Sequence, residues 1–242
     1  MLWWIVATVA AYFVKGICGF TNGLVFTTIL SFTTDNVNIS PVSLVVGYPT
    51  NLIMAWKNRK AINWRLCLAL TALVILGNIP GAYLLKNADT GMIKVVLGFI
   101  IIYLSVEMYL NEIRKKKKKS SKLALGIVGV LAGLIAGIYG VGALLGVYVN
   151  KITNDTKAFK ANANVVYFVS DTFRMCLYIA WGIVTWDIVK QAVLLVPFML
   201  ISLFLGMKLS DRINEKTARR IVILMLIISG TALIVNNWPV FG

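Results

Sequence analysis

The chain has 242 residues, of which 59% are hydrophobic, and its mean hydropathy is +0.83. Soluble domains contain about 45–50% apolar residues, so this composition excludes a water-soluble fold and predicts an all-α integral membrane protein. The net charge of +15 lies mostly in short connections between apolar blocks, and we therefore expect topology signals and no nucleic-acid partner. The chain has no histidine and three cysteines without a CxxC pair, which argues against a metal site, a cofactor or enzymatic hydrolysis.

Eight apolar blocks follow one another along the chain. They are residues 1–32, 37–56, 66–85, 92–110, 123–149, 158–181, 188–207 and 221–236. Most are about 20 residues long, which suits one helical crossing of a hydrocarbon core roughly 30 Å thick. The first and fifth blocks are too long for one crossing, and each contains a glycine-rich stretch, at residues 16–23 and 137–142.

The two glycine-rich stretches indicate an internal repeat. Residues 16–19 align with 137–140, residues 61–65 with 183–187, and residues 81–94 with 206–219. We therefore predict two repeats of four blocks, residues 1–112 and 123–242, joined by a basic cytoplasmic linker at residues 113–122.

The basic residues predict how the repeats cross the membrane. They concentrate in four connections, at residues 57–65, 114–122, 151–160 and 208–220, and the positive-inside rule places all four in the cytoplasm. Eight single crossings would put the last two outside. The conflict disappears if the fifth block is a re-entrant helical hairpin. By analogy between the repeats, we predict that the first block is also such a hairpin, and that each hairpin is followed by three transmembrane helices. The odd number of crossings then makes the second repeat an inverted copy of the first, which is a transporter architecture.

The order and duplication of these motifs resemble the TauE/SafE sulfite exporter family over nearly the whole chain. The residues that carry the resemblance are Gly19-Phe20-Thr21-Asn22-Gly23, Gly140-Val141-Gly142-Ala143-Leu144-Leu145, Arg59-Lys60-Ala61-Ile62-Asn63-Trp64, Gly182-Ile183-Val184-Thr185-Trp186, Gly81-Ala82-Tyr83-Leu84 and Gly206-Met207-Lys208-Leu209. The resemblance implies membrane export or exchange of sulfite, sulfonates or related organic anions. Thr21-Asn22 and Ala143 stand where the family often has glycine, and this departure leaves the choice of substrate open.

A hairpin that turns near mid-membrane directs the N-terminus of its returning helix, with free N–H groups, towards the membrane centre. An anion would be held there, and glycine lets the backbone approach it closely. The residues of the two hairpin tips that we predict to bind substrate are Gly19, Thr21, Asn22, Gly23, Gly140 and Gly142. The alternative is that these small residues only allow close packing of helices.

Charged residues inside the apolar blocks supply the other site candidates. Lys15 and Arg174 occupy such positions, where a charge is costly and usually faces a polar cavity. The alternative role for Lys15 is to extend its ammonium group to the lipid headgroups. The alternative role for Arg174 is an ion pair with Asp171 that has no part in substrate binding. Asn51 and Thr172 correspond in the predicted repeat and complete the predicted substrate site, with hydrogen bonding between helices as their alternative.

From the sequence we predict a secondary transporter, an exporter of a small sulfur-containing anion such as sulfite or a sulfonate, in the plasma membrane. The anion is expected to bind near the midplane between the two hairpins. Expected partners are this anion, the lipid bilayer and a coupling proton or ion, and a homodimer stays open. No ATP-binding loop of the GxxxxGK[ST] kind is present. Two other functions stay open, an anion channel and a non-transport membrane protein such as an assembly factor.

Overall fold

The computed structural model describes residues 1–87, 89–113, 122–153 and 156–210, and isolated positions between 220 and 235. In chain order the described elements are α1 Leu2–Cys18, α2 Asn22–Leu30, α3 Asn36–Lys57, the 3-10 helix η1 Arg59–Ala61, α4 Trp64–Asn87, α5 Thr90–Ile113, α6 Lys122–Tyr139, α7 Ala143–Ile152, α8 Thr156–Ala180 and α9 Trp186–Leu209. All of these elements are helical, which confirms the predicted all-α fold class. Nearly all of the predicted linker and about half of the last apolar block lie outside the described residues.

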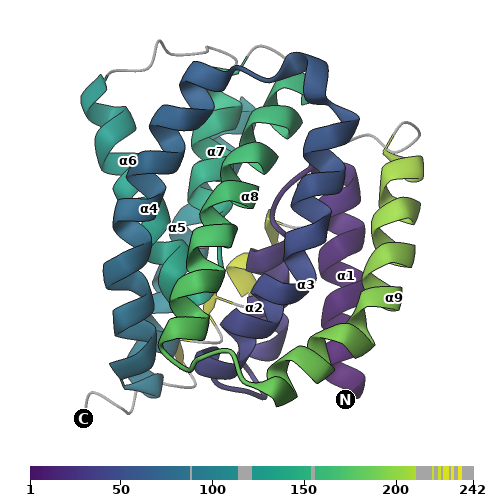
Figure 1. Ribbon diagram of the computed structural model, residues 1–242, viewed down its shortest axis with the longest axis vertical. Helices are drawn as coiled ribbons and strands as arrows, with labels where there is room; N and C mark the ends of the chain where they lie inside the picture. Colours follow the sequence, from purple (N-terminus) through teal and green to yellow (C-terminus); the bar gives the residue numbers. More distant parts are fainter. Residues whose placement is uncertain are drawn as a thin grey trace.

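The long helices run roughly side by side along the longest axis of the molecule (Figure 1). On length and composition alone, α4 and α9 are the two described helices that could span a membrane, and shorter apolar helices lie at Leu2–Cys18 and Leu125–Tyr139. Helix α8 is less apolar because it contains buried polar and charged residues. These residues form part of the site described below.

The first and fifth apolar blocks are each divided into two helices. Helix α1 ends at Gly19 with φ +88°, and α6 ends at Gly140 with φ +67°. This left-handed conformation is the usual way in which glycine ends a helix. After each break the chain turns back, so that α2 packs on α1 and α7 packs on α6 (Figure 1). We call residues 19–21 the first break and residues 140–142 the second break.

The same close contact between helices occurs twice in the bundle. Helix α1 packs along α9, and α6 packs along α4. A Cβ added to Gly81 would lie 3.0 Å from the Cα atom of Gly137, and one added to Gly206 would lie 3.1 Å from that of Gly16. In the alignment of the two halves, Gly16 corresponds to Gly137 and Gly81 to Gly206. Both contacts therefore need the absence of a side chain at equivalent positions.

We expect Gly81→Ala and Gly206→Ala to destabilise the protein to a similar extent. Each new methyl group would press on the backbone of the facing helix, and overpacking of this kind costs about 1–3 kcal/mol. Gly126→Ala in α6 is the matched control, because a Cβ there would meet nothing within 4 Å. Thermal unfolding in detergent measures all three variants. If Gly81→Ala and Gly206→Ala unfold at the same temperature as the wild-type protein, the packing of these helices is not as close as described.

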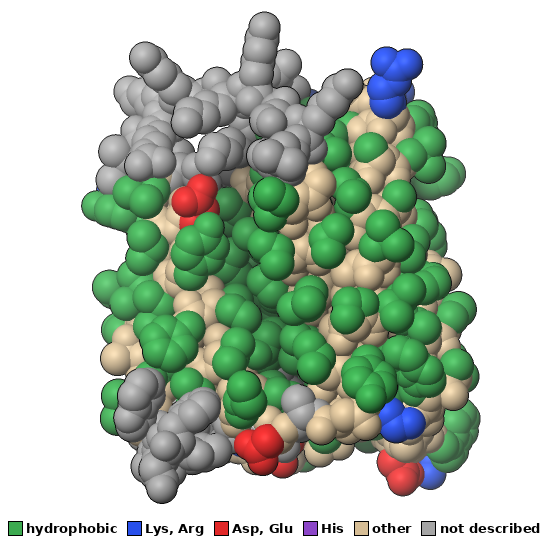
Figure 2. Space-filling model, turned by 90° about the vertical axis from the view of Figure 1, so that its left-hand side faces the viewer, with side chains coloured by type: hydrophobic (Ala, Val, Ile, Leu, Met, Phe, Trp, Pro, Cys, Tyr) green, Lys and Arg blue, Asp and Glu red, His purple; other side chains and the backbone are tan. Residues whose placement is uncertain are grey.

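The outer surface of the bundle is apolar over most of its height. Figure 2 shows one face covered by hydrophobic side chains, with the visible charged side chains towards its two ends. On α9 the exposed apolar residues include Val193, Leu194, Phe198, Ile201, Phe204 and Leu205. The exposed residues Trp64 and Trp186 begin α4 and α9 at opposite ends of the bundle (Figure 1). An apolar belt with aromatic residues near its ends is typical of a protein surrounded by lipid.

Candidate functional site

Helices α3 and α8 pack against each other in the interior, and each presents a polar stripe. On α3 the residues Ser43, Gly47 and Asn51 are four positions apart and therefore lie on one face. On α8 the corresponding stripe contains Tyr167 and Asp171, which are also four positions apart. The small residues on α3 leave room between the helices, and polar groups line the space.

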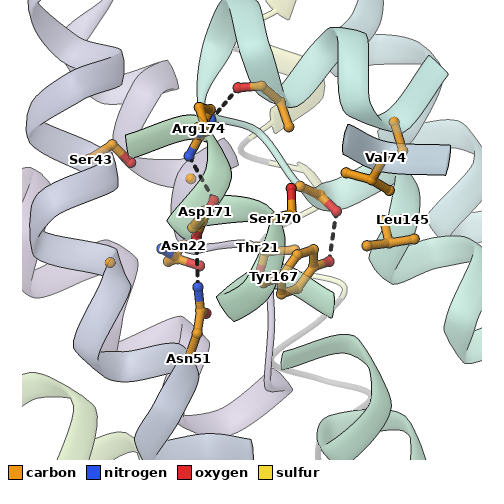
Figure 3. Close-up of a pocket in the computed structure, with 16 residues that line it drawn as sticks. Thr21, Asn22, Ser43, Asn51, Val74, Leu145, Tyr167, Ser170, Asp171 and Arg174 are labelled. Carbon is orange, nitrogen blue, oxygen red and sulfur yellow. Dashed lines mark hydrogen bonds and ion pairs between the residues drawn. The ribbon is translucent and has the colours of Figure 1, made fainter. Parts of the chain in front are cut away.

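A buried chain of hydrogen bonds joins three charged side chains. The Nζ atom of Lys15 donates to Oγ1 of Thr50 at 2.7 Å and also to Oδ1 of Asn51. The amide nitrogen of Asn51 donates to one carboxylate oxygen of Asp171 at 2.8 Å, and Arg174 donates to the other at 3.0 Å (Figure 3). Lys15 is 0% exposed and Arg174 is 3% exposed. The ammonium group of α1 is thus connected through α3 to the ion pair on α8.

The guanidinium group of Arg174 is held in place from several sides. It donates to the carbonyl of Ala136 near the end of α6, and it lies 5.7 Å from the centre of the Tyr178 ring. The Tyr178 hydroxyl in turn donates to the carbonyl of Gly137 at 2.6 Å and lies 2.9 Å from the hydroxyl of Ser40. The Nε–H of Arg174 has no hydrogen-bond partner among the described residues. A buried donor without a partner is costly, so this N–H is available to a ligand.

The two helix breaks meet beside this chain of hydrogen bonds. A Cβ added to Gly23 would overlap the carbonyl oxygen of Gly140. Thr21 precedes α2 and Gly142 precedes α7, and neither N-terminus has a side-chain cap. The first N–H groups of both helices therefore lack intrahelical partners. Together with the helix dipoles, they favour negative charge.

Thr21 has an unusual backbone conformation. Its φ is +73°, and it is the one non-glycine residue with positive φ in the described part of the chain. A β-branched residue pays roughly 1–2 kcal/mol for this left-handed conformation. Glycine would adopt it without that cost. The first break thus keeps a strained threonine at a position that favours glycine.

A small cavity of about 40 Å³ lies where the breaks meet the polar stripes of α3 and α8. Its lining residues are Thr21, Asn22, Gly23, Ser43, Gly47, Asn51, Val74, Ala132, Ala136, Gly140, Gly142, Leu145, Tyr167, Ser170, Asp171 and Arg174. Most of them are buried and none is exposed. The cavity has room for about three water molecules, which is also the scale of a small oxyanion. Figure 3 shows the polar residues gathered opposite Val74 and Leu145.

The cavity brings together most of the residues predicted to bind substrate. The lining residues among them are Thr21, Asn22, Gly23, Asn51, Gly140, Gly142, Asp171 and Arg174. Lys15 does not line the cavity, but it donates a hydrogen bond to Asn51, which does.

Besides Lys15, two other predicted residues lie outside the cavity, Gly19 and Thr172. The carbonyl of Gly19 accepts a hydrogen bond from Asn164 at 3.0 Å. The hydroxyl of Thr172 donates to the carbonyl of Phe168 at 2.8 Å. It also lies 3.0 Å from the hydroxyl of Tyr48. Thr172 follows Asp171 directly, so the two side chains point to different sides of α8.

Some lining residues were not predicted from the sequence. Ser43 and Gly47 precede Asn51 on the same face of α3, and their four-residue spacing is the signal that identifies them. The hydroxyl of Tyr167 donates to the carbonyl of Gly142 at 2.7 Å, which ties α8 to the second break. Nothing in the local sequence of Tyr167 distinguishes it from other tyrosines in apolar helices.

Comparison with known proteins identifies the family of the chain. The family model described as sulfite exporter TauE/SafE matches residues 4–233. No curated protein and no solved structure matches the chain in these comparisons. Because the family model spans nearly all of the 242 residues, the chain belongs to the sulfite exporter TauE/SafE family of membrane transporters.

Proposed function

We propose that the protein is a secondary transporter that exports a small sulfur-containing anion, such as sulfite or a sulfonate, across the plasma membrane. The anion binds in the cavity between the two helix breaks. The single observation that carries the proposal is the charge of the buried cluster. Lys15 and Arg174 supply two positive charges, and Asp171 supplies one negative charge.

Uncompensated charge inside an apolar bundle is expensive. Even after relaxation, burying an ion costs several kcal/mol unless it is paired. The pair Arg174–Asp171 compensates itself, whereas Lys15 contacts only the neutral groups of Thr50 and Asn51 in its recorded hydrogen bonds. An anion in the adjacent cavity supplies the counter-charge.

The donors around the cavity suit an oxyanion. Arg174, with its free Nε–H, and residues at the uncapped N-termini of α2 and α7 all line the cavity. Backbone N–H groups at helix N-termini bind sulfate-like and carboxylate groups, and guanidinium gives strong charge-assisted hydrogen bonds to such oxygens. Converging donors of these two kinds favour a sulfur oxyanion over a neutral ligand.

We propose further that the chain is built as two inverted repeats, each with a re-entrant hairpin and three transmembrane helices. The chain reversals at both breaks support this architecture, and so does the glycine contact that occurs once between α1 and α9 and once between α4 and α6. Residues 1–112 and 123–242 are the proposed repeats. An odd number of crossings in each repeat inverts the second relative to the first.

Transport by alternating access fits the buried aromatic residues that flank the cavity-lining residues along α8. Along α8, Phe159 precedes the cavity-lining residues, and its ring packs edge-on against Phe20 with 5.2 Å between ring centres. Tyr178 follows the cavity-lining residues and bonds to α3 and α6. We propose that these aromatic residues close the path on each side of the cavity, which distinguishes a transporter from an open channel. We propose that a proton or another ion drives opening of the two sides in turn.

Binding to the purified protein tests the proposed function. Sulfite is expected to raise the melting temperature of the detergent-solubilised protein as its concentration increases, because it binds only the folded state. At 100 times Kd the gain is about 2.7 kcal/mol. Sodium chloride at equal ionic strength is the control. If neither sulfite nor any small sulfonate stabilises the protein, the proposed site does not exist.

We expect cysteine labelling in intact cells to report the proposed topology. In a cysteine-free background, an impermeant reagent should modify Asp187→Cys from outside, because the α8–α9 connection is proposed to be external. Lys60→Cys and Lys157→Cys should be protected until the membrane is permeabilised. All three side chains are exposed at helix ends. External labelling of Lys157→Cys would exclude the second re-entrant hairpin.

A further inference from the structure

We infer that the site is matched to a single negative charge: it takes hydrogensulfite or a sulfonate monoanion and discriminates against dianions of the same size. This inference rests on the proposed function and specifies the chemical class of its substrate. It follows from the number of buried charges at the cavity and from their hydrogen bonds.

The hydrogen-bond partners of each group suit its charged form. Lys15 is the donor in both of its recorded hydrogen bonds, and Arg174 is the donor to Ala136 and to Asp171. Asp171 is the acceptor in both of its hydrogen bonds, from Asn51 and from Arg174. We assign these three groups as an ammonium, a guanidinium and a carboxylate, which this set of partners accommodates. With this assignment the buried cluster has one positive charge in excess.

No other lining residue changes this count. Apart from Asp171 and Arg174, the residues that line the cavity from α2, α3, α4, α6, α7 and α8 are all uncharged. Two lysines lie close to the first break without lining the cavity. Lys15 of α1 joins the cluster through Asn51. Lys160 of α8 packs against Gly19, and its Nζ donates to the carbonyl of Ile17 at 2.8 Å and to Oγ of Ser210 at 3.4 Å, at the end of α1, so we do not count it with the cluster. Lys94 of α5 is paired with Asp35 at 2.9 Å, away from the cavity.

The count decides which anion is balanced. A monoanion brings the buried cluster to neutrality, whereas a dianion leaves one uncompensated negative charge in an apolar interior. Buried charge without a partner is strongly disfavoured. A dianion would also compete with Asp171 for the same guanidinium group. Asp171 thus acts as a resident anion that sets the charge of the substrate.

A pair of anions with similar shape and different charge tests the inference. Methanesulfonate is a fixed monoanion, and sulfate is a dianion in which an oxygen replaces the methyl group. Calorimetric titration of the full-length protein in detergent, at constant ionic strength, gives the affinity for each. We expect methanesulfonate to bind at least about tenfold more tightly than sulfate.

Asp171→Asn should shift this preference. The variant has two excess positive charges at the site, so the ratio of sulfate affinity to methanesulfonate affinity should rise at least about tenfold. Asp187→Asn is the matched control, because the side chain of Asp187 is 91% exposed at the start of α9. It should leave the ratio unchanged.

A measurement on the unaltered protein covers the case in which Asp171→Asn does not fold. Sulfite is mainly a monoanion in mildly acidic solution and a dianion in mildly alkaline solution. Sulfite affinity should therefore fall as the pH rises, while methanesulfonate affinity, which reports the titration of the protein itself, should fall less.

The outcomes separate the inference from the proposed function. If neither sulfite nor methanesulfonate binds, the proposed function fails and the inference fails with it. If both bind but sulfate binds equally well, or if sulfite and methanesulfonate have the same pH dependence, the charge match is wrong and the anion site remains. An unchanged affinity ratio in folded Asp171→Asn would also overturn the role of Asp171.

Discussion

The double variant Asp171→Asn/Arg174→Gln is expected to lose anion binding and transport while it still folds. Replacing both residues removes the ion pair without leaving one buried charge unpaired, which is the usual cause of severe destabilisation. The cavity nevertheless loses the guanidinium donor whose Nε–H has no partner among the described residues. Hydrogen bonds to charged groups contribute about 1.5–3 kcal/mol, so we expect roughly a 100-fold loss of affinity.

The matched control is a second ion pair between a basic side chain and an aspartate. Lys94 and Asp35 lie 2.9 Å apart, with side chains that are 17% and 50% exposed, and neither lines the cavity. Lys94→Gln/Asp35→Asn should keep the affinity of the parent protein. Isothermal titration with methanesulfonate and the melting temperature are compared for both double variants. Parental affinity in Asp171→Asn/Arg174→Gln would show that the pair on α8 has only a structural role.

Lys15→Met is expected to have the second largest effect. Methionine fills a similar volume, but the excess positive charge of the buried cluster is lost, and anion binding then leaves a net negative charge. Lys15 acts through Asn51 without lining the cavity, so the expected loss is at least about tenfold in affinity, or roughly 1.4 kcal/mol. Removal of a buried charge should not reduce the melting temperature of the ligand-free protein.

Lys190→Met provides the control for Lys15→Met. The Lys190 side chain is 60% exposed near the start of α9, and its charge is screened by solvent. Titration with methanesulfonate should give the affinity of the parent protein for this variant. If Lys15→Met also binds with parental affinity, the charge of the cluster does not hold the anion, and the donors of Arg174 and the helix N-termini remain as the explanation.

The helices themselves could be predicted from the sequence to a large extent. The apolar blocks at residues 37–56, 66–85 and 188–207 agree within two residues with α3, α4 and α9. Hydrophobic runs of this length are sufficient to locate helices in a membrane protein, because some apolar residues of each helix are buried and the rest face lipid. The glycine-rich stretches also placed the interruptions, because Gly19 and Gly140 adopt a left-handed conformation where α1 and α6 end.

The packing partners of the helices could not be predicted. The contacts between α1 and α9 and between α4 and α6 join segments far apart in the sequence. Glycines such as Gly16 and Gly206 indicate close approach, but the sequence does not say which helix approaches. The choice depends on the complementary surfaces of whole helices. The proposed inverted repeat explains why the contact between α1 and α9 resembles the contact between α4 and α6, but it does not predict either contact from the sequence.

The candidate site was predictable where a single residue breaks a local rule. Lys15, Asp171 and Arg174 are charged residues within apolar segments, and such residues are expected to share a partner or a cavity. The role of Asn51 as a bridge from Lys15 to Asp171 depends on the crossing of α3 and α8, which has no local signal. Thr172, which corresponds to Asn51 in the aligned repeats, does not line the cavity, because alignment of the repeats does not fix the direction of a side chain.

The measurement that tests the central claim most directly is flux of isotopically labelled sulfite into liposomes that contain the purified protein. We predict saturable uptake that is inhibited by methanesulfonate, and uptake at the level of protein-free liposomes for Asp171→Asn/Arg174→Gln. The Lys94→Gln/Asp35→Asn variant should transport like the parent protein. Sulfite uptake by the parent protein no faster than by protein-free liposomes, with either direction of the proton gradient, would contradict the proposal that this cavity carries a sulfur-containing anion across the membrane.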